Sequence, residues 1–400
     1  METLAGKVSL RRNHKLAFIA VPRVGNRPRV TQIVPVNATA VAAPTSLFEK
    51  YRRVYKIGIV FLYLSAIHNV SSAVVKCLYV HDAIALINTV SLSVRVICST
   101  LTAHLFYAVY PAVANFFAKE QASDPELYKT NRRRLRTKTV VVSALVVGYG
   151  ISTLLLQSLK LQFLGLRAYF LEEIYFIDIE NVAIGEAVLS LLAVLHFLAY
   201  DICNLFVPTA CIVVYMRICD WCRLKVCQFR NIVQSCTREE SILPPHIQDL
   251  QERYSSLWNS IQDLDHQFCL AVFLWYIDFV LNIIMKVRVL YYTGTDFNVF
   301  YALSVYVQLA YIGFVFLLIS VSASNIVVEA RHINYDICQL VCRLPTGDWH
   351  TCNQIMLLQE EIASCKLAFT GWNCFNVDRS FILAVIGAIV TYAVVLQQLT

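Results

Sequence analysis

Residues 380–399 read SFILAVIGAIVTYAVVLQQL, a run without a charged side chain. As an α-helix this run is roughly 30 Å long, which matches the thickness of the hydrocarbon core of a bilayer. Small and polar residues recur on one face of the helix at steps of three and four positions; they are Ser380, Ala384, Gly387, Thr391, Val394 and Gln398. That face either packs closely against a neighbouring helix or lines water, because an unpaired Gln398 amide is unfavourable in lipid. Because this helix is the last element of the sequence, we expect it to lie at a central seam or a symmetry axis.

The composition of the whole chain is that of a multi-pass membrane protein. Hydrophobic residues fill 58% of the 400 positions and charged residues only 15%, with a mean hydropathy of +0.57. No secretory signal peptide precedes the first apolar run, so we expect that run to act as its own insertion signal. The 14 cysteines fall in apolar helices or in basic segments, and we expect reduced thiols rather than a disulfide framework.

Apolar runs of spanning length divide the chain and predict an all-α fold. We expect seven transmembrane helices, at about residues 57–77, 84–117, 139–159, 184–216, 268–289, 299–326 and 380–399. The first six lie within 57–326, between a cytosolic arm at 1–56 and a cytosolic helix at 327–374. A polar block at 217–267 forms a further cytosolic segment. Within it, Leu250, Tyr254, Leu257 and Ile261 step by four and three residues, which predicts an amphipathic helix after a break at Pro244 and Pro245.

The basic residues predict how these helices are oriented. The segments 1–56, 119–138, 217–267 and 327–374 hold 27 of the 34 lysines and arginines. Segments rich in lysine and arginine stay in the cytosol, and these four alternate to one side of the membrane. We therefore expect the N-terminus to be cytosolic and, after seven spans, the C-terminus to be extracellular.

The terminal helix resembles the signature of the insect gustatory receptor family. That signature is Thr-Tyr, five apolar residues and Gln-Phe, and here the chain has Thr391-Tyr392, AVVLQ and Gln398-Leu399. The preceding run GWNCFNVDRSFILAVIGAIV, at 371–390, is also similar to the family's approach to this helix. The chain departs from the signature at two places: Leu399 replaces phenylalanine, and Gln397 occupies the last of the five apolar positions.

The resemblance implies a ligand-gated, non-selective cation channel in the plasma membrane of a sensory neuron. It implies a homo- or heterotetramer with other gustatory receptor subunits, in which four copies of helix seven, 375–400, line the pore and 327–374 belongs to a cytosolic anchor domain. The pore and gate residues are then Thr391, Tyr392, Val394, Val395, Gln398 and Leu399. A narrow ring of Leu399 side chains excludes water, and a ring of Gln398 amides adds dipoles but no charge.

The implied ligand is a small-molecule tastant, held within the outer halves of the other helices. On the fifth span Trp275, Asp278, Asn282 and Lys286 share one face. Asp278 and Lys286 either neutralise each other or form a polar wall for a hydrogen-bonding ligand, with Trp275 as a stacking surface. The residues that could complete the pocket are Tyr301, Tyr306, Gln308, Arg95 and Glu186, although Arg95 and Glu186 could instead pair with each other.

The residue after the Thr-Tyr pair bears on the class of tastant. Sugar-receptor members of the family carry glutamate there, whereas this chain has Ala393. The resemblance therefore favours bitter or uncharacterised compounds over sugars.

The remaining motifs predict no enzyme, cofactor, metal site or nucleic-acid interface. Cys219-x-x-Cys222 with Cys227 has part of a zinc spacing, but no second pair of ligands stands at a matching distance. The arginines at 132–134 indicate orientation near anionic membrane lipid rather than contact with nucleic acid. The alternatives to a channel are a seven-helix G-protein-coupled receptor, which needs an extracellular N-terminus, and a secondary transporter, which typically has broken and repeated helices.

Overall fold

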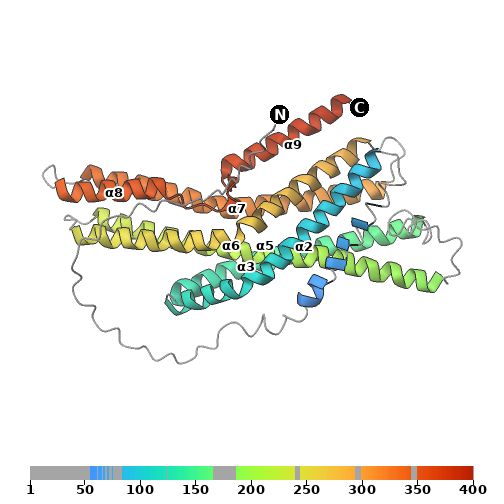
Figure 1. Ribbon diagram of the computed structural model, residues 1–400, viewed down its shortest axis with the longest axis horizontal. Helices are drawn as coiled ribbons and strands as arrows, with labels where there is room; N and C mark the ends of the chain where they lie inside the picture. Colours follow the sequence, from blue (N-terminus) through green and yellow to red (C-terminus); the bar gives the residue numbers. More distant parts are fainter. Residues whose placement is uncertain are drawn as a thin grey trace, which may run out of the picture. The chain divides into compact units, whose positions relative to one another are not determined.

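The computed structural model describes residues 55–60, 62–64, 66–67, 70–71, 74, 83–123, 125–164, 186–238, 244–292, 299–343 and 349–399. In that part the chain is almost entirely helical (Figure 1), with α2 (Ala83–Ser123), α3 (Pro125–Leu164), α5 (Glu186–Arg238), α6 (Pro244–Tyr292), α7 (Val299–Arg343), α8 (Trp349–Ser364) and α9 (Arg379–Leu399). Between α8 and α9, β1 (Thr370–Gly371) pairs antiparallel with β2 (Phe375–Asn376). Most of the arm expected at 1–56 lies outside the described residues.

Helices α5, α6 and α7 each continue well beyond the length of a bilayer crossing. They contain 53, 49 and 45 residues, whereas about 20 residues span a hydrocarbon core. Helix formation is cooperative and no proline follows the first turn of α6, so the helix propagates from polar into apolar sequence without a break. The predicted spans and the predicted polar segments are therefore parts of the same helices. The expected break at Pro244 is the start of α6.

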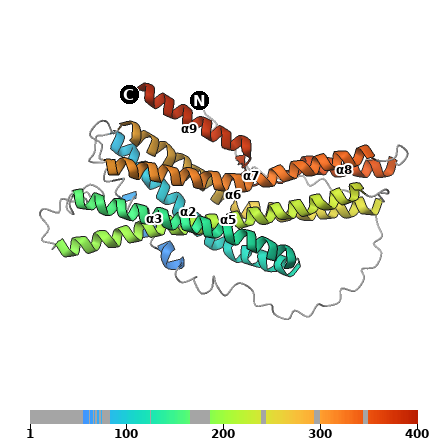
Figure 2. The same cartoon turned by 180° about the vertical axis from the view of Figure 1, so that it is seen from behind.

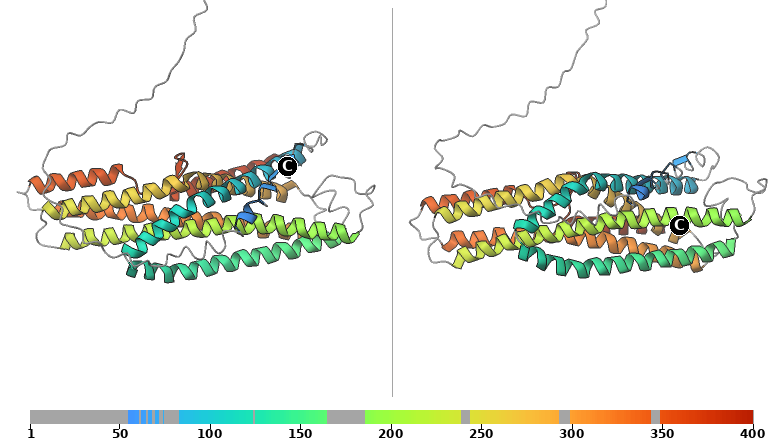
Figure 3. Two further views of the ribbon diagram at one scale, coloured as in Figure 1. Left: turned by 60° about the horizontal axis from the view of Figure 1, so that its bottom comes forward. Right: turned by 90° about the horizontal axis from the view of Figure 1, so that it is seen from below.

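The polar ends of α5, α6 and α7 run side by side with α8 (Figure 3). The predicted amphipathic stripe of α6 is confirmed, since Leu250, Tyr254, Leu257 and Ile261 are all buried. Helix α8 contributes an apolar face of its own, Ile355, Leu358 and Ile362, also buried. Because both stripes have helical spacing, these helices pack through continuous apolar seams.

Charged side chains join α5 to its neighbours at the same end. Arg230 Nε donates to Asp336 Oδ2 of α7 at 2.8 Å, and Arg223 reaches Glu329 Oε1 of α7 at 3.1 Å. On its other sides α5 pairs Asp220 with Lys138 of α3 at 2.7 Å and Lys225 with Glu120 of α2 at 3.0 Å. Most of these groups are half-buried, so removing one partner of a pair would leave a poorly solvated charge.

Aromatic side chains fill the apolar part of the helix bundle. Tyr215 of α5 is fully buried, and three rings surround it with centroids 5.5 to 5.8 Å away: Phe268 and Trp275 of α6 and Phe369 of the segment after α8. In the described part of the chain three helical stretches are long and apolar enough to cross a membrane: Ser93–Glu120, Pro245–Leu290 and Ala302–Cys342. These stretches correspond to predicted spans two, five and six.

Helix α9 lies along α6 and α7, at the edge of the bundle (Figure 2). It begins at Arg379 and ends at Leu399, so the expected terminal helix at 380–399 is confirmed as a helix.

Candidate functional site

The polar face predicted on α6 holds a small cluster of charged and hydrogen-bonded groups. Arg95 of α2 places its Nε 3.8 Å from Asp278 Oδ1. Asn282 Nδ2 donates to the same Oδ1 at 2.9 Å and to the Asp278 carbonyl at 2.8 Å. The structure therefore brings Arg95, Asp278 and Asn282 together across two helices that are distant in sequence. The pairing of Arg95 with Glu186 is not tested, because the Glu186 side chain lies outside the described part.

Trp275 lies one helical turn before Asp278 on α6, and its side chain is 4% exposed. Its ring packs edge-on against Tyr215, with an interplanar angle of 70°. Its Nε1 has no hydrogen-bond partner among the described residues. An unpaired buried N–H group is unfavourable, so this group favours an acceptor that the polypeptide does not supply, such as water or a ligand.

Of the other residues expected in the pocket, Gln308 and Tyr306 form no hydrogen bond or ion pair with this cluster in the described part of the chain. Gln308 Nε2 donates to Ser304 Oγ at 3.1 Å within α7, and the Tyr306 side chain is 57% exposed. Tyr301 belongs to α7, but its side chain lies outside the described residues. The assignment of these three residues to a pocket therefore remains a prediction.

The two faces of α9 have different environments. Phe381, Ile382, Val385 and Ile389 pack against the core. The face with the small and polar stripe is exposed over its whole length, at Ser380, Ala384, Gly387, Thr391, Val394 and Gln398. Exposed apolar residues flank the stripe, including Leu383 at 70% and Val390 at 55%. A helix with this much apolar exposure requires a further partner, which lipid or another subunit can provide.

The predicted gate residues lie at the C-terminal end of α9. Thr391 Oγ1 donates to the Gly387 carbonyl at 2.9 Å, within the helix. Val394 and Val395 are nearly half exposed, at 47% and 45%, and Gln398 is exposed. Tyr392 is half-buried, and the Leu399 side chain lies outside the described part. One subunit therefore presents most of these residues on an uncovered surface.

Asp378 caps the N-terminus of α9. Its Oδ1 accepts hydrogen bonds from the Ser380 hydroxyl at 2.6 Å and from the Phe381 amide at 2.9 Å. These donors, the Ser380 hydroxyl first, hold the pKa of Asp378 below its ordinary value of 3.8. The side chain satisfies an amide that the helix leaves without an internal partner, which explains where α9 starts.

The β1–β2 hairpin ahead of α9 is fastened to α6, a feature that the sequence interpretation missed. Asp265 of α6 accepts two hydrogen bonds of 2.7 Å from Thr370, one from the backbone amide and one from the hydroxyl. Asp265 is 4% exposed. The sequence did contain a signal, because Asp265 follows Ile261 by four residues and so lies on the apolar face of an amphipathic helix. A carboxylate there requires a buried partner.

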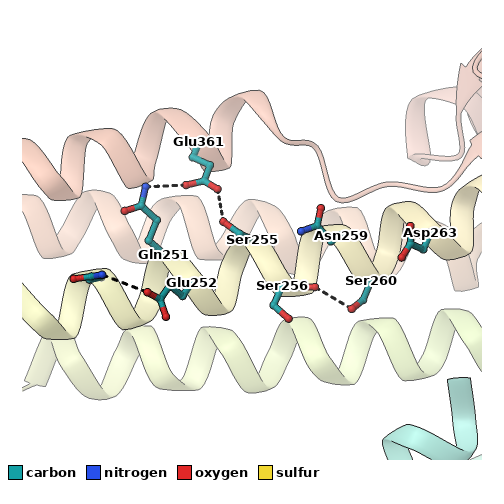
Figure 4. Close-up of a pocket in the computed structure, with 9 residues that line it drawn as sticks. Gln251, Glu252, Ser255, Ser256, Asn259, Ser260, Asp263 and Glu361 are labelled. Atoms are coloured by element: carbon teal, nitrogen blue, oxygen red, sulfur yellow. Dashed lines mark hydrogen bonds between the residues drawn. The ribbon is translucent and has the colours of Figure 1, made fainter. Parts of the chain in front are cut away.

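A second polar surface lies at the opposite end of α6. Side chains from Gln248 to Asp263, together with Glu361 of α8, line an open groove of about 700 Å³ (Figure 4). Glu361 accepts hydrogen bonds from Gln251 at 3.1 Å and from Ser255 at 2.7 Å. Every lining residue is polar or charged and the groove is open, so it does not suit an apolar small molecule.

The cysteine spacing at 219–222 does not build a metal site in the described part of the chain. Cys219 and Cys222 are both fully buried in α5, and burial raises the pKa of the Cys222 thiol. No group of three or more His, Cys, Asp and Glu side chains in the described residues is arranged to hold a metal ion.

Comparison with known proteins identifies the family. Residues 41–399 match the family model for the 7tm chemosensory receptors. The chain also resembles the solved structure of the insect olfactory receptor OR5 from Machilis hrabei, with a TM-score of 0.70 and 13% identity over 90% of this chain and 93% of that one. The same receptor in complex with eugenol matches with a TM-score of 0.68 and 13% identity, over 88% and 90% of the two chains. No curated protein sequence matches significantly.

At 13% identity the structural likeness shows the fold, and the family model, which covers most of the chain, shows the family. The resemblance to the insect gustatory receptor family that the terminal helix indicated is confirmed at the level of the chemosensory receptor family. The chain therefore belongs to the 7tm chemosensory receptor family and is a multi-pass membrane protein.

Proposed function

We propose that the protein is a gustatory receptor that acts as a tastant-gated, non-selective cation channel in the plasma membrane of a sensory neuron. In this proposal seven helices cross the membrane, with the N-terminus cytosolic and the C-terminus extracellular. Four subunits, identical or mixed with other gustatory receptors, surround a pore lined by α9. The cytosolic end of the subunit is the bundle of α8 with the polar ends of α5, α6 and α7.

The observation that carries the proposal is the uncovered face of α9. Its opposite face packs on α6 and α7, whereas the stripe from Ser380 to Gln398 is exposed. Small and uncharged polar residues on such a face suit a helix that meets its own copies around water, because small side chains leave room and polar ones can contact ions. The fold shared with an insect olfactory receptor supports the same arrangement.

The proposed ligand is a small organic molecule bound near Trp275, Asp278 and Asn282. The related OR5 receptor has been solved in complex with eugenol, a small molecule. In this chain the unpaired Nε1 of Trp275 and the carboxylate of Asp278 offer a hydrogen-bond donor and an acceptor near each other on one helix. Ala393 after the Thr-Tyr pair favours bitter or uncharacterised compounds over sugars.

Two measurements in one heterologous cell line test the proposal. Epitope tags at residues 1 and 400 report topology: only the tag at residue 400 should stain cells that have not been permeabilised. Whole-cell recording during application of bitter compounds and sugars should show a current that Na⁺ and K⁺ both carry, and that persists when G-protein signalling is blocked. An extracellular N-terminus, or a response that requires G proteins, would overturn the proposal.

A further inference from the structure

The hairpin between α8 and α9 is held to α6 by three hydrogen bonds. Two of them join Asp265 to the amide and hydroxyl of Thr370, both at 2.7 Å. The third is donated by the Trp372 amide to the carbonyl of Cys269, one turn further along α6, at 3.0 Å. A carboxylate and a backbone carbonyl at consecutive turns of one helix thus hold the two sides of β1. The hairpin cannot shift along α6 without breaking these bonds.

The hairpin itself leaves little freedom for movement. The Cys374 amide donates to the Gly371 carbonyl at 2.8 Å, and the two residues between them, Trp372 and Asn373, have φ angles of 47° and 57°. A left-handed backbone is common for asparagine but rare for tryptophan, so the turn is held by its surroundings. The Phe375 ring covers Gly371 so closely that a Cβ at Gly371 would overlap it.

The same ring connects the hairpin to the first turn of α9. Phe375 and Phe381 stack with centroids 4.3 Å apart and an interplanar angle of 3°. Tyr276 of α6 meets both rings edge-on, at 5.5 Å and 4.9 Å. The Tyr276 hydroxyl lies 2.7 Å from Ser320 Oγ of α7, and this hydrogen bond fixes the position of the tyrosine ring. Edge-to-face and stacked aromatic contacts are directional, and they hold the start of α9 in one orientation relative to α6.

One continuous helix therefore carries three contacts in order. Asp265 and the Cys269 carbonyl hold the hairpin, Tyr276 holds the start of α9, and Asp278 pairs with Arg95 of α2. Tyr276 and Asp278 are only two residues apart. An α-helix is stiff over three or four turns, so these contacts are carried by one rigid element.

We propose that α6 sets the position of α9, with Asp265 and Tyr276 as positioning residues that couple the Arg95–Asp278 contact to the terminal helix. This inference rests on the proposed function only in taking α9 as the helix that lines the pore. The coupling between Asp278 and α9 is a property of the subunit, and it is measurable whether or not the protein conducts ions.

The test measures hydrogen–deuterium exchange of the peptide covering 379–392 in the purified full-length protein. Thr370→Val removes the hydroxyl that donates to Asp265 while keeping the backbone amide. It should raise exchange in this peptide about tenfold, the factor expected from the loss of a hydrogen bond to a charged group. Thr370→Ser keeps the hydroxyl and should exchange like the wild type. Ser255→Ala is the matched control, because it breaks a hydrogen bond of the same length from α6 to Glu361 of α8 and should leave α9 unchanged.

A double-mutant cycle separates coupling from a merely structural role. Asp278→Asn should raise exchange at 379–392 in the wild-type background and raise it much less in the Thr370→Val background, because the connection is then already broken. Equal effects in both backgrounds, or unchanged exchange in Thr370→Val, would overturn the inference. Basal current recorded from the same variants distinguishes the two proposals. Altered exchange in α9 without current from any variant would support the coupling and contradict the channel function.

Discussion

Phe375 and Phe381 lie parallel, 4.3 Å apart, on either side of the point where the hairpin becomes α9. The stack depends on Gly371, because the Phe375 ring occupies the space where a side chain at Gly371 would stand. The glycine is therefore needed for the close approach of a ring, and its own backbone conformation does not require it.

Gly371→Ala should destabilise the protein by about 1–3 kcal/mol, the range for overpacking a filled site. The added methyl group displaces Phe375 and with it the stack on Phe381. Thermal unfolding in detergent measures the effect. Gly148→Ala is the matched control, since a Cβ at Gly148 has nothing within 4 Å and the change should be neutral or slightly stabilising. Equal thermal unfolding temperatures for the two variants would show that the Phe375 ring tolerates a methyl group at position 371.

Asp278→Ala should lower stability by about 2 kcal/mol, because Asn282 loses a charged hydrogen-bond acceptor and Arg95 loses an ion-pair partner. The double variant Arg95→Gln/Asp278→Asn should recover part of the loss, since it leaves no unpaired charge. Asp249→Asn, which removes an exposed ion pair with Arg253 on the same helix, should change stability by less than about 0.5 kcal/mol. Thermal unfolding of the purified single and double variants measures these effects. If the losses of stability caused by Arg95→Gln and by Asp278→Asn simply add in the double variant, a direct Arg95–Asp278 interaction is contradicted.

In the functional assay, Asp278→Ala should also shift the activating concentration of a tastant while the subunit still reaches the cell surface. This expectation follows from the position of Asp278 on α6, one turn after Trp275, whose buried Nε1 has no hydrogen-bond partner among the described residues. Surface labelling and dose–response curves from the same cells measure both quantities. Loss of surface protein with an unchanged activating concentration for the remainder would assign Asp278 a structural role alone.

Leu399→Ser should raise the current recorded without ligand, because a hydroxyl in the gate ring favours water in the narrow part of the pore. Gln398→Glu would add one carboxylate per subunit and should change divalent-cation permeability or block. Leu383→Ser on the same helix is the control: this side chain is 70% exposed but lies near the opposite end of α9. Whole-cell recording with equal surface expression decides the matter, and unchanged basal current and ion preference in both gate variants would place the gate elsewhere.

Acid should weaken the start of α9 through Asp378. Its folded pKa is lowered by the Ser380 and Phe381 donors, so the cap contributes about 1 kcal/mol at neutral pH. That contribution is fully present above the ordinary value of 3.8 and is lost as the pH falls through the lowered folded pKa. Asp378→Asn keeps a capping oxygen that does not titrate. The wild type should therefore lose thermal stability relative to this variant below about pH 4, and parallel pH profiles would contradict the assignment.

The sequence predicted the elements whose pattern is local. The stripe of Leu250, Tyr254, Leu257 and Ile261 and the uncharged run at 380–399 follow from helical periodicity and length alone, and both are helices in the structure. The break at Pro244 was predictable because two consecutive prolines, Pro244 and Pro245, are favoured in the first turn of a helix and disfavoured in its interior. These features depend on neighbours within a few residues.

The contacts between helices were not predictable in the same way. Periodicity shows that Arg95 and Asp278 each lie in an apolar helix, but not that α2 and α6 are neighbours, so Glu186 and Lys286 were equally reasonable partners. The hairpin was missed because β1 and β2 have only two residues each, and their stability comes from Asp265 and the Phe375 ring rather than from strand propensity. Such elements exist only once the tertiary contacts are formed.

The Arg95–Asp278 contact has a consequence for biosynthesis. The ribosome makes α2 long before α6, so α2 enters the bilayer while its arginine has no counter-charge from α6. A charge at the centre of an inserting helix is unfavourable by about 2.5–3.5 kcal/mol, and less towards its ends. When the later helix docks against the earlier one, each of the two charges gains an opposite charge as its partner. A subunit whose helices assemble wrongly keeps a bare charge within the membrane, which is the kind of defect that cellular quality control can recognise before the protein reaches the cell surface.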